Sequence, residues 1–159
     1  MRDVIASSDN KFYKLLKKLD KKKYRDENSI FKAEGEKFLN ENINFNKIIV
    51  KESKFDYFDE KYDISKHDNL TILKDNLFDE VSTQENSQGI IFLYSKNLNT
   101  IEDIQGDVVI LDDIQDPGNA GTIIRTMIAA NFQNLILTKG SVDVYNPKTV
   151  RATMSGIFK

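Results

Sequence analysis

The sequence has no cysteine and no tryptophan, and its single histidine is His67. Without cysteine the chain can form no disulfide, no thiolate nucleophile and no cysteine-based zinc site. One histidine is too few for a His-rich metal site, so no metal is expected. The absence of disulfides is typical of a reducing compartment, and we therefore expect a cytoplasmic protein.

Long apolar runs are absent as well. No stretch of about 18 apolar residues occurs, so no membrane span is expected, and residues 1–9 lack the apolar core of a signal peptide. The sequence has 159 residues, of which 40% are hydrophobic and 30% are charged. These values are typical of a globular protein with one ordinary domain or two small ones.

Charge is unevenly distributed along the chain. The formal net charge is −2, which argues against a uniformly basic nucleic-acid binder. Residues 1–28 contain nine Lys or Arg and five Asp or Glu, a local net charge of +4. Residues 29–86 contain eight basic and thirteen acidic residues, a local net charge of −5. The sequence thus predicts a basic N-terminal segment on a mildly acidic body.

The basic segment has the periodicity of an amphipathic helix that starts near Asn10, with Ser8 or Asp9 as its cap. One face carries Phe12, Leu15, Leu16 and Leu19. The opposite face carries Lys11, Lys14, Lys17, Lys18 and Lys21. After a polar connection at 22–28, we expect strands at 29–33, 47–51, 70–73 and 89–94 and helical segments at 34–39, 55–58 and 76–81.

A polar segment without periodicity follows at 95–106, and we interpret it as a linker between two domains. The expected division is a domain at 1–98, a linker at 99–106 and a domain at 107–159. The second domain should contain buried strands at 107–112 and 134–138, a turn at 116–119, a helix over about 120–131, and a further helix capped by Asn146. Because strands and helices alternate, both domains should be α/β.

The most informative pattern is the turn and helix after residue 111. Ligand sites of open α/β sheets lie at the carboxyl ends of strands, where this turn is expected. Gly121 and Arg125 are four residues apart and share a helix face. We expect the Arg125 guanidinium to lie back over Gly121 toward Asn119, at a helix N-terminus that favours anions. Asn119 could orient Arg125 or cap the helix. The alternative is an ordinary surface ion pair between Arg125 and the aspartates Asp112, Asp113 or Asp116.

Residues 111–126 read Leu-Asp-Asp-Ile-Gln-Asp-Pro-Gly-Asn-Ala-Gly-Thr-Ile-Ile-Arg-Thr. This run resembles the first signature motif of the SpoU branch of SPOUT RNA methyltransferases, whose core is Asn-x-Gly-x-x-x-Arg. The continuation at 131–132, 141–154 and 156–158 is also similar to the family. A looser similarity to the family's substrate-binding domain covers the first half, through its Lys-rich helix, Glu34-Gly35-Glu36-Lys37-Phe38 and Gln88-Gly89-Ile90.

The resemblance implies a fold, a reaction and partners. The first domain would be a small α/β/α sandwich that binds RNA, and the second would be the start of a trefoil-knotted SPOUT domain. The activity would be methyl transfer from S-adenosylmethionine to a ribose 2′-hydroxyl of rRNA or tRNA, in a homodimer. Arg125 and Asn119 would be the catalytic residues. The candidate RNA-binding residues are Lys11, Lys14, Lys18, Lys21, Lys22, Lys23, Arg25, Lys148 and Arg151.

In the family, a Gly-x-Glu-Gly loop and a Ser-Leu-Asn segment form the donor pocket, and both belong downstream of Phe158. We therefore expect this chain to be a fragment whose donor-binding residues lie beyond Lys159, and which neither binds the donor nor methylates RNA by itself. The second strand–helix pair should also be less stable than the first domain, because its sheet lacks neighbours.

Two other functions are compatible with parts of the pattern. A Rossmann-type nucleotide-binding enzyme would explain Gly118 and Gly121 after a strand, but neither Gly-x-Gly-x-x-Gly nor Gly-Lys-Ser/Thr is present. A non-catalytic RNA-binding protein would need only the first domain. Tyr24, within the basic segment, could stack on an unpaired base or pack under the loop.

Overall fold

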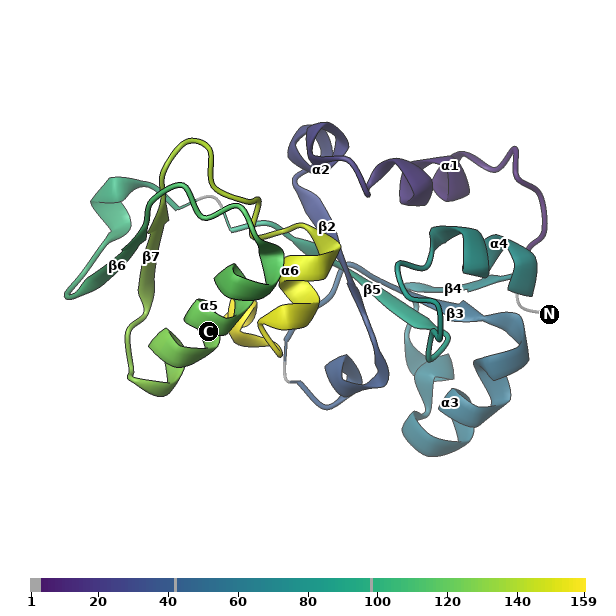
Figure 1. Cartoon of the computed structure of the whole chain (residues 1–159). Coiled ribbons are helices and arrows are strands. Elements are labelled where there is room, and N and C mark those ends of the chain that lie inside the picture. Colours follow the sequence, from purple (N-terminus) through teal and green to yellow (C-terminus); the bar gives the residue numbers. More distant parts are fainter. Residues whose placement is uncertain (1–3, 42, 98) are drawn as a thin grey trace. The chain divides into compact units, whose positions relative to one another are not determined.

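The computed structural model describes residues 4–41, 43–97 and 99–159. The chain divides into two compact units, Met1–Ser95 and Lys96–Lys159, and each is described by itself (Figure 1). Both units combine strands with helices, which confirms the predicted α/β class. Among the described residues, every helix is too short or too polar to cross a membrane.

The first unit is built on a five-stranded sheet with the order β1-β4-β3-β5-β2. Strands β1, β4 and β3 run parallel, whereas β5 is antiparallel to both β3 and β2. The strands are β1 (Val4–Ile5), β2 (Ile30–Glu34), β3 (Lys47–Lys51), β4 (Leu70–Leu73) and β5 (Ile90–Ser95). The helices are α1 (Lys11–Lys18), α2 (Lys22–Asn28), α3 (Phe55–Tyr62) and α4 (Asp75–Val81), with short 3₁₀ turns η1 (Glu36–Leu39), η2 (Glu52–Lys54) and η3 (Ile64–Lys66).

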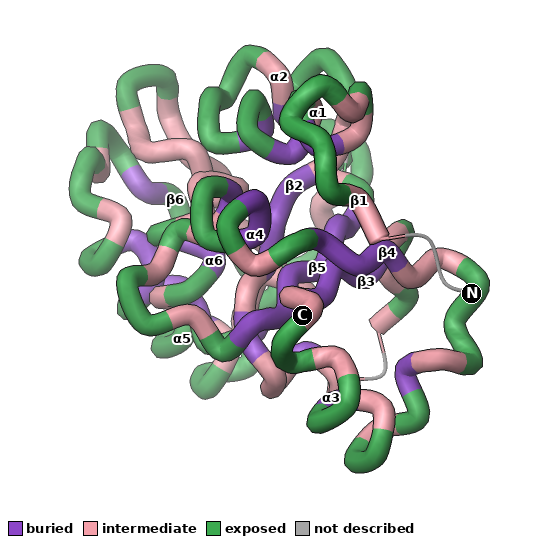
Figure 2. Tube along the Cα trace, turned by 90° about the vertical axis from the view of Figure 1, so that its right-hand side faces the viewer, coloured by how far each residue is buried: buried purple, intermediate pink, exposed green. Residues whose placement is uncertain are grey.

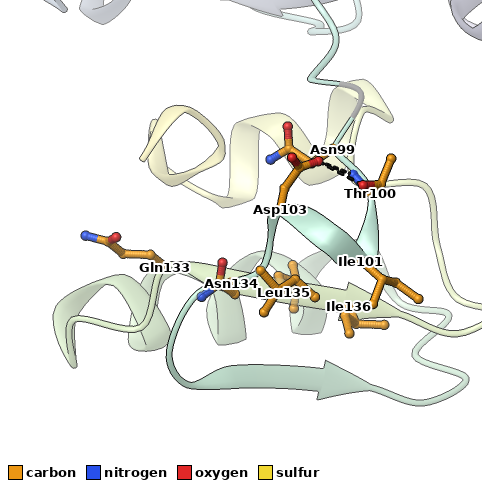
Figure 3. Close-up of a pocket in the computed structure, with 9 residues that line it drawn as sticks. Asn99, Thr100, Ile101, Asp103, Gln133, Asn134, Leu135 and Ile136 are labelled. Carbon is orange, nitrogen blue, oxygen red and sulfur yellow. Dashed lines mark hydrogen bonds between the residues drawn. The ribbon is translucent and has the colours of Figure 1, made fainter.

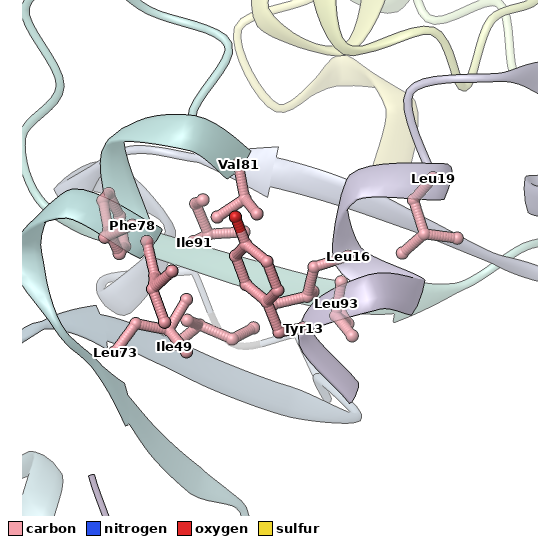
Figure 4. Packing of buried hydrophobic residues seen from close by; sticks show 10 residues of the cluster. Tyr13, Leu16, Leu19, Ile49, Leu73, Phe78, Val81, Ile91 and Leu93 are labelled. Atoms are coloured by element: carbon pink, nitrogen blue, oxygen red, sulfur yellow. The ribbon is translucent and has the colours of Figure 1, made fainter. Parts of the chain in front are cut away.

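Both faces of this sheet are covered, because successive side chains of a strand point to opposite faces. On one face, Ile49, Ile91 and Leu93 pack against α1 and α4 in a fully buried cluster (Figure 4). On the other face, the Phe92 ring lies 6.1 Å from Phe38 of η1. The central strands are buried along almost their whole length (Figure 2). The first unit is therefore an α/β/α sandwich, as the resemblance implied.

Helix α1 begins one residue later than expected, and its cap is Asn10 itself. The Asn10 side chain accepts hydrogen bonds from the backbone N–H groups of Phe12 and Tyr13. The predicted apolar face is largely correct, because Leu16 and Leu19 are fully buried. Tyr13 is also buried, and its hydroxyl donates to Glu80 of α4. The helix is thus fastened to the sheet by apolar contacts and by one polar contact at its edge.

Two buried cations hold the connection between α1 and α2. The Arg25 guanidinium donates to the carbonyl oxygens of Leu19 and Asp20, both at 2.8 Å. The Lys32 ammonium lies 2.7 Å from the Asp20 carboxylate and donates to the carbonyl oxygen of Val81. Residues 22–28 form helix α2, so the predicted polar connection is wrong. A segment with so few apolar residues shows no helical periodicity, and these buried polar contacts are invisible in the sequence.

The second unit contains the parallel pair β6 (Val108–Leu111) and β7 (Asn134–Leu137), joined through α5 (Pro117–Ala129). It also contains α6 (Pro147–Ala152) and the 3₁₀ turns η4 (Ile101–Asp103) and η5 (Gly156–Phe158). Parallel strands are normally covered on both faces. Here β7 is only half-buried, and Ile110 of β6 is 58% exposed. The turn η4 lies inside the segment that we interpret as a linker.

Helix α5 begins three residues earlier than predicted. Asp116 is its N-cap and Pro117 its first residue, so the predicted turn at 116–119 is the cap and first turn of the helix. The Asp-Pro pair is itself a helix-start signal, since proline is favoured at the first helical position. Asn146 and Pro147 open α6 in the same way, as predicted.

Gly121 is where α5 packs against α6. A Cβ placed at Gly121 would lie 2.8 Å from the carbonyl carbon of Ala152, which leaves no room for a side chain. Gly121 is buried, whereas Arg125 is exposed. The expectation that Arg125 fills the space over Gly121 is therefore wrong, because Ala152 occupies it. Because Gly121 has no side chain, α5 and α6 can approach this closely.

We predict that Gly121→Ala destabilises the second unit by about 1–3 kcal/mol, the usual cost of overpacking. Alanine is the better helix former by roughly 1 kcal/mol, so any loss must come from the contact with α6. Urea unfolding followed by far-ultraviolet circular dichroism measures the change.

Gly118→Ala is the comparison on the same helix, because its Cβ would meet no other helix and only the Asp116 carboxylate oxygen, at 3.1 Å; it should cost less stability than Gly121→Ala. Adding Ala152→Gly to Gly121→Ala should restore part of the lost stability. Equal stability of the wild type and Gly121→Ala would show that the α5–α6 contact is looser than the structure indicates.

Candidate functional site

The turn after β6 is tied to the loop after β7 at the carboxyl ends of both strands. The Thr138 hydroxyl donates to the Asp112 carboxylate at 2.7 Å and accepts from the Asp113 N–H at 3.1 Å. Ser141 accepts from the Ile114 N–H at 3.2 Å. Asp113 has a φ of 51°, a left-handed conformation that aspartate tolerates better than most residues. These contacts fix the turn that leads into α5.

Arg125 is exposed on α5 and forms no ion pair or hydrogen bond within the described part of the chain. Asp112 is instead engaged by Thr138, and Asp116 by the backbone of α5. The ordinary surface ion pair that could explain this arginine is therefore not formed. A guanidinium is permanently charged and carries five donors, so Arg125 presents these donors to solvent or to a ligand.

Asn119 does not cap α5, because Asp116 has that role. The Asp116 carboxylate accepts a hydrogen bond from the Asn119 backbone N–H at 2.7 Å. The Asn119 side chain is exposed, and across the described residues it makes no hydrogen bond to Arg125. Of the two roles left open for Asn119, capping is wrong, and orientation of Arg125 is not seen in this structure.

The lysines of the first unit differ in whether an acidic neighbour neutralises them. Lys14, Lys22 and Lys23 pair with Asp9, Asp26 and Glu27 at 2.8, 2.5 and 3.8 Å respectively. Lys11, Lys18 and Lys21 are exposed and form no ion pair among the residues described. We call these three the unpaired lysines. Among the lysines of residues 11–23, they are the ones that can bind an anion without first breaking an ion pair.

Lys17 lies on the same helix but serves the fold. Its ammonium donates to Glu80 at 2.7 Å, beside the Tyr13 hydroxyl. The hydrogen bond from Lys17, followed by that from Tyr13, lowers the pKa of the Glu80 carboxyl group. The three groups form an ion pair and a hydrogen bond between α1 and α4, so Lys17 is not part of a free basic face.

Arg25 does not belong to the surface where it was predicted. Its side chain is only 2% exposed, and its guanidinium donates hydrogen bonds to the carbonyl oxygens of Leu19 and Asp20, directly after α1. It therefore cannot contact RNA without opening this part of the fold. Its burial could not be found from the sequence, because an arginine in a lysine-rich run has the same pattern as its neighbours.

Lys148 and Arg151 are exposed on α6, where their spacing of three residues places them on the same side of the helix. Neither forms an ion pair within the described part of the chain. Both therefore stay candidates for contact with RNA. Their helix is held against α5 at Gly121, so its position follows from that packing.

Two hollows of the second unit lie beside β7. One of about 250 Å³ is lined by residues of η4 and β7, and within it Asp103 accepts hydrogen bonds from the backbone N–H and hydroxyl of Thr100 (Figure 3). The other, of about 350 Å³, has a mixed lining of apolar side chains from α5, β7 and η5 and of polar residues that include Asn97, Asn99 and Gln133. Neither is lined by Arg125 or Asn119. Among the described residues, no group of three His, Asp or Glu side chains could hold a metal ion.

Comparison with known proteins identifies relatives of both units. Residues 107–159 match the SpoU rRNA Methylase family, and residues 10–91 match the MRM3-like substrate binding domain. The chain is 30% identical over 157 residues to the 23S rRNA (guanosine(2553)-2'-O)-methyltransferase RlmP of Bacillus subtilis, covering 97% of this chain and 62% of that protein. It is 28% identical over 163 residues to the mitochondrial rRNA methyltransferase 3 of Xenopus laevis, covering 95% of this chain and 39% of that protein.

A solved structure shares the fold. It is the AdoMet-bound rRNA methyltransferase from Sinorhizobium meliloti, with a TM-score of 0.80 and 26% identity, covering 98% of this chain and 62% of that one. The chain thus spans about three fifths of the length of the relative from Bacillus subtilis and of this structural neighbour.

We predict that Asp116→Ala lowers the stability of the second unit by about 1 kcal/mol, the usual cost of removing an N-cap side chain. Asn119→Ala should change stability by less than about 0.5 kcal/mol, as expected for an exposed side chain without such a contact. Thermal and urea unfolding of both variants measure the difference. A larger loss in Asn119→Ala than in Asp116→Ala would return the capping role to Asn119.

Proposed function

Because the chain belongs to the SpoU rRNA methylase family, we propose that the protein transfers a methyl group from S-adenosylmethionine to a ribose 2′-hydroxyl of ribosomal RNA. The observation that carries the proposal is Arg125, at the arginine of the family motif, with an exposed guanidinium free of any ion pair in the described residues. The names of the Bacillus and Xenopus relatives support rRNA as the substrate class.

Arg125 stabilises charge on the RNA in this proposal. Removing the proton of a ribose hydroxyl leaves a negative alkoxide, and a positioned cationic donor favours that charge. A guanidinium rarely loses a proton in proteins, so we assign Arg125 to holding a phosphate and stabilising the alkoxide. Asn119, six residues earlier on α5, is a second donor and acceptor for the same RNA segment.

The first unit binds RNA in this proposal, and its unpaired lysines make the first contacts. Lys11 and Lys18 are seven residues apart on α1 and therefore lie on the same side of the helix, and Lys21 follows directly before α2. The match of residues 10–91 to a substrate binding domain supports this role. Lys148 and Arg151 would add contacts from the second unit, whereas buried Arg25 is left out of the proposed face.

The donor pocket is not assigned to residues of this chain. S-adenosylmethionine carries an ammonium group, which needs an acidic partner or several acceptors once it leaves water. The hollow of about 350 Å³ beside β7 is lined by no Asp or Glu side chain, and its polar lining includes Asn97, Asn99 and Gln133. It offers amide acceptors but no acidic partner for that ammonium group.

The homodimer and the cytoplasmic location also belong to the proposal. The homodimer rests on family membership, and the location rests on the cysteine-free composition.

The RNA-binding role predicts a salt-dependent affinity that depends on the unpaired lysines. Replacing Lys11, Lys18 and Lys21 together by Glu should weaken binding to an rRNA stem-loop and flatten the slope of log K against log salt. Each lost phosphate contact should change that slope by about 0.7–0.9. Fluorescence anisotropy across a salt series measures both quantities.

Lys61, Lys66 and Lys74 provide a charge-matched control, because each is already paired with an acidic side chain. Replacing these three by Glu changes the net charge equally but should disturb RNA binding far less. Equal losses in the two triple variants would mean that only net charge matters, and that α1 is no RNA-contacting face.

The catalytic role predicts a kinetic defect without a folding defect. Arg125→Ala in the native gene product should lower the methylation rate at saturating rRNA on the order of 10²–10³-fold, as loss of one well-placed charged donor does elsewhere. Arg125→Lys should also be poor, because an ammonium lacks the planar fork. Transfer of tritium from labelled S-adenosylmethionine to rRNA measures the rate.

Thr126→Ala, at the neighbouring exposed position of α5, is the control for changes to the helix surface. Unfolding temperatures should be similar in all these variants, since Arg125 makes no contact that stabilises the described fold. A near wild-type rate in Arg125→Ala would remove the catalytic role. RNA binding without any methyl transfer by the native protein would favour a non-catalytic RNA-binding function instead.

A further inference from the structure

Tyr24 lies at the junction of the two basic helices, between lysines from each. The Lys18 ammonium is 5.2 Å from the centre of the Tyr24 ring, and the Lys23 ammonium is 5.9 Å from it. Tyr24 is half-buried, so part of its ring reaches solvent. An aromatic ring beside cations is the combination that single-stranded nucleic acids use, since bases stack on the ring and phosphates meet the cations.

The backbone under Tyr24 is held by buried contacts. Its neighbour Arg25 is buried and donates to the carbonyl oxygens of Leu19 and Asp20. Asp20 in turn pairs with buried Lys32 of β2. Tyr24 therefore stands on a backbone that is fastened to α1 and to the sheet. A ring held in place loses little conformational freedom when a ligand stacks on it.

The charges around Tyr24 distinguish its site from that of Tyr57, an exposed tyrosine of the same unit. Tyr57 of α3 is 47% exposed, and Lys61 lies 5.4 Å from its ring centre. Lys61, however, is paired with Glu36, and the hydrogen bonds from Lys61 and then Tyr62 lower the pKa of that carboxyl group. The Tyr57 site therefore contains an ionised carboxylate, which repels phosphates. Lys18 at the Tyr24 site has no acidic partner among the described residues.

We propose that Tyr24, with Lys18 and Lys23, is a stacking site for one unpaired nucleotide of the RNA substrate. The base lies on the exposed part of the ring and displaces a lysine from it. That lysine then turns to the adjacent phosphate. Lys18 can do so without breaking an ion pair, whereas Lys23 must first leave Glu27, an exposed pair at 3.8 Å that is weak. This inference rests on the proposed function and adds to it a preference for single-stranded over double-stranded RNA.

The preference follows from the geometry of RNA helices. Within a duplex, both faces of each base are covered by neighbouring bases, so no π-face is available to the ring. A loop, bulge or strand end exposes such a face. Contacts from lysines to phosphates are available in both forms of RNA. The tyrosine should therefore contribute only to the binding of unpaired RNA, and the lysines should contribute to the binding of both.

The test uses the 159-residue chain with two probes of the same sequence. One is an rRNA stem-loop with 2-aminopurine in its loop, and the other is the fully paired duplex. Tyr24→Leu should weaken stem-loop binding by roughly 5- to 100-fold, the range for loss of one stacked base. Duplex binding and the salt slope should not change, because no charge is removed. Wild-type protein should quench the 2-aminopurine emission, and Tyr24→Leu should not.

Tyr24→Phe and Tyr57→Leu are the controls. Phenylalanine keeps the ring and should keep both the affinity and the quenching, which also shows that the site tolerates substitution at this position. Tyr57→Leu removes a more exposed tyrosine with its own lysine and should leave both unchanged.

Several results would overturn the stacking site. They are equal losses for stem-loop and duplex, a Tyr24→Phe variant as weak as Tyr24→Leu, or wild-type binding of the stem-loop without quenching. Where one of these results is found and the triple Glu variant of Lys11, Lys18 and Lys21 still loses RNA binding, the proposed RNA-binding function stands and only the stacking site fails. Failure of the wild-type chain to bind either RNA would overturn both.

Discussion

The carbonyl oxygens of Leu19 and Asp20, directly after α1, are partly or fully shielded from water and would be costly to leave without hydrogen-bond donors. Arg25 satisfies both at 2.8 Å, and the ion pair between Asp20 and buried Lys32 fastens the same turn to β2. These contacts hold the turn between α1 and α2 and fasten it to β2. Without them, the lysines of α1 and α2 and the ring of Tyr24 would have no fixed relation to each other.

A different constraint governs the second unit. Its helices approach so closely that only glycine fits at position 121, against Ala152. This contact orients α5, and the cap at Asp116 together with the turn held by Thr138 sets where α5 begins. The position of Arg125 follows from the position of α5 and requires no contact of the Arg125 side chain itself. This side chain is exposed and unpaired in the described residues, one turn along the helix from the contact at Gly121.

The two units differ in how their charges are used. In the first, the ion pairs of Lys14, Lys17, Lys22 and Lys23 leave three of the seven lysines in residues 11–23 unpaired, and these are the ones proposed to contact phosphates. In the second, the key cation is a single arginine at the motif position. An exposed array of lysines suits sequence-independent contact with a backbone. The planar guanidinium of Arg125, on a helix that is held in place, is better suited to binding one defined chemical group. The proposed division, with RNA binding in the first unit and charge stabilisation in the second, rests on this difference.

The sequence by itself determined the α/β class, most of the strands, the apolar face of α1 and the family, since these depend on local periodicity and on a specific motif around Arg125. Only the tertiary structure decided that residues 22–28 are helical, that Arg25 is buried, that Asp116 rather than Asn119 caps α5, and that Gly121 serves α6. The same holds for which lysines are paired, because several of their acidic partners are distant in sequence, as Glu80 is from Lys17. Periodicity reports which face of an element is apolar. It carries no information about which distant polar group or backbone atom meets a given side chain, because that depends on how the elements pack.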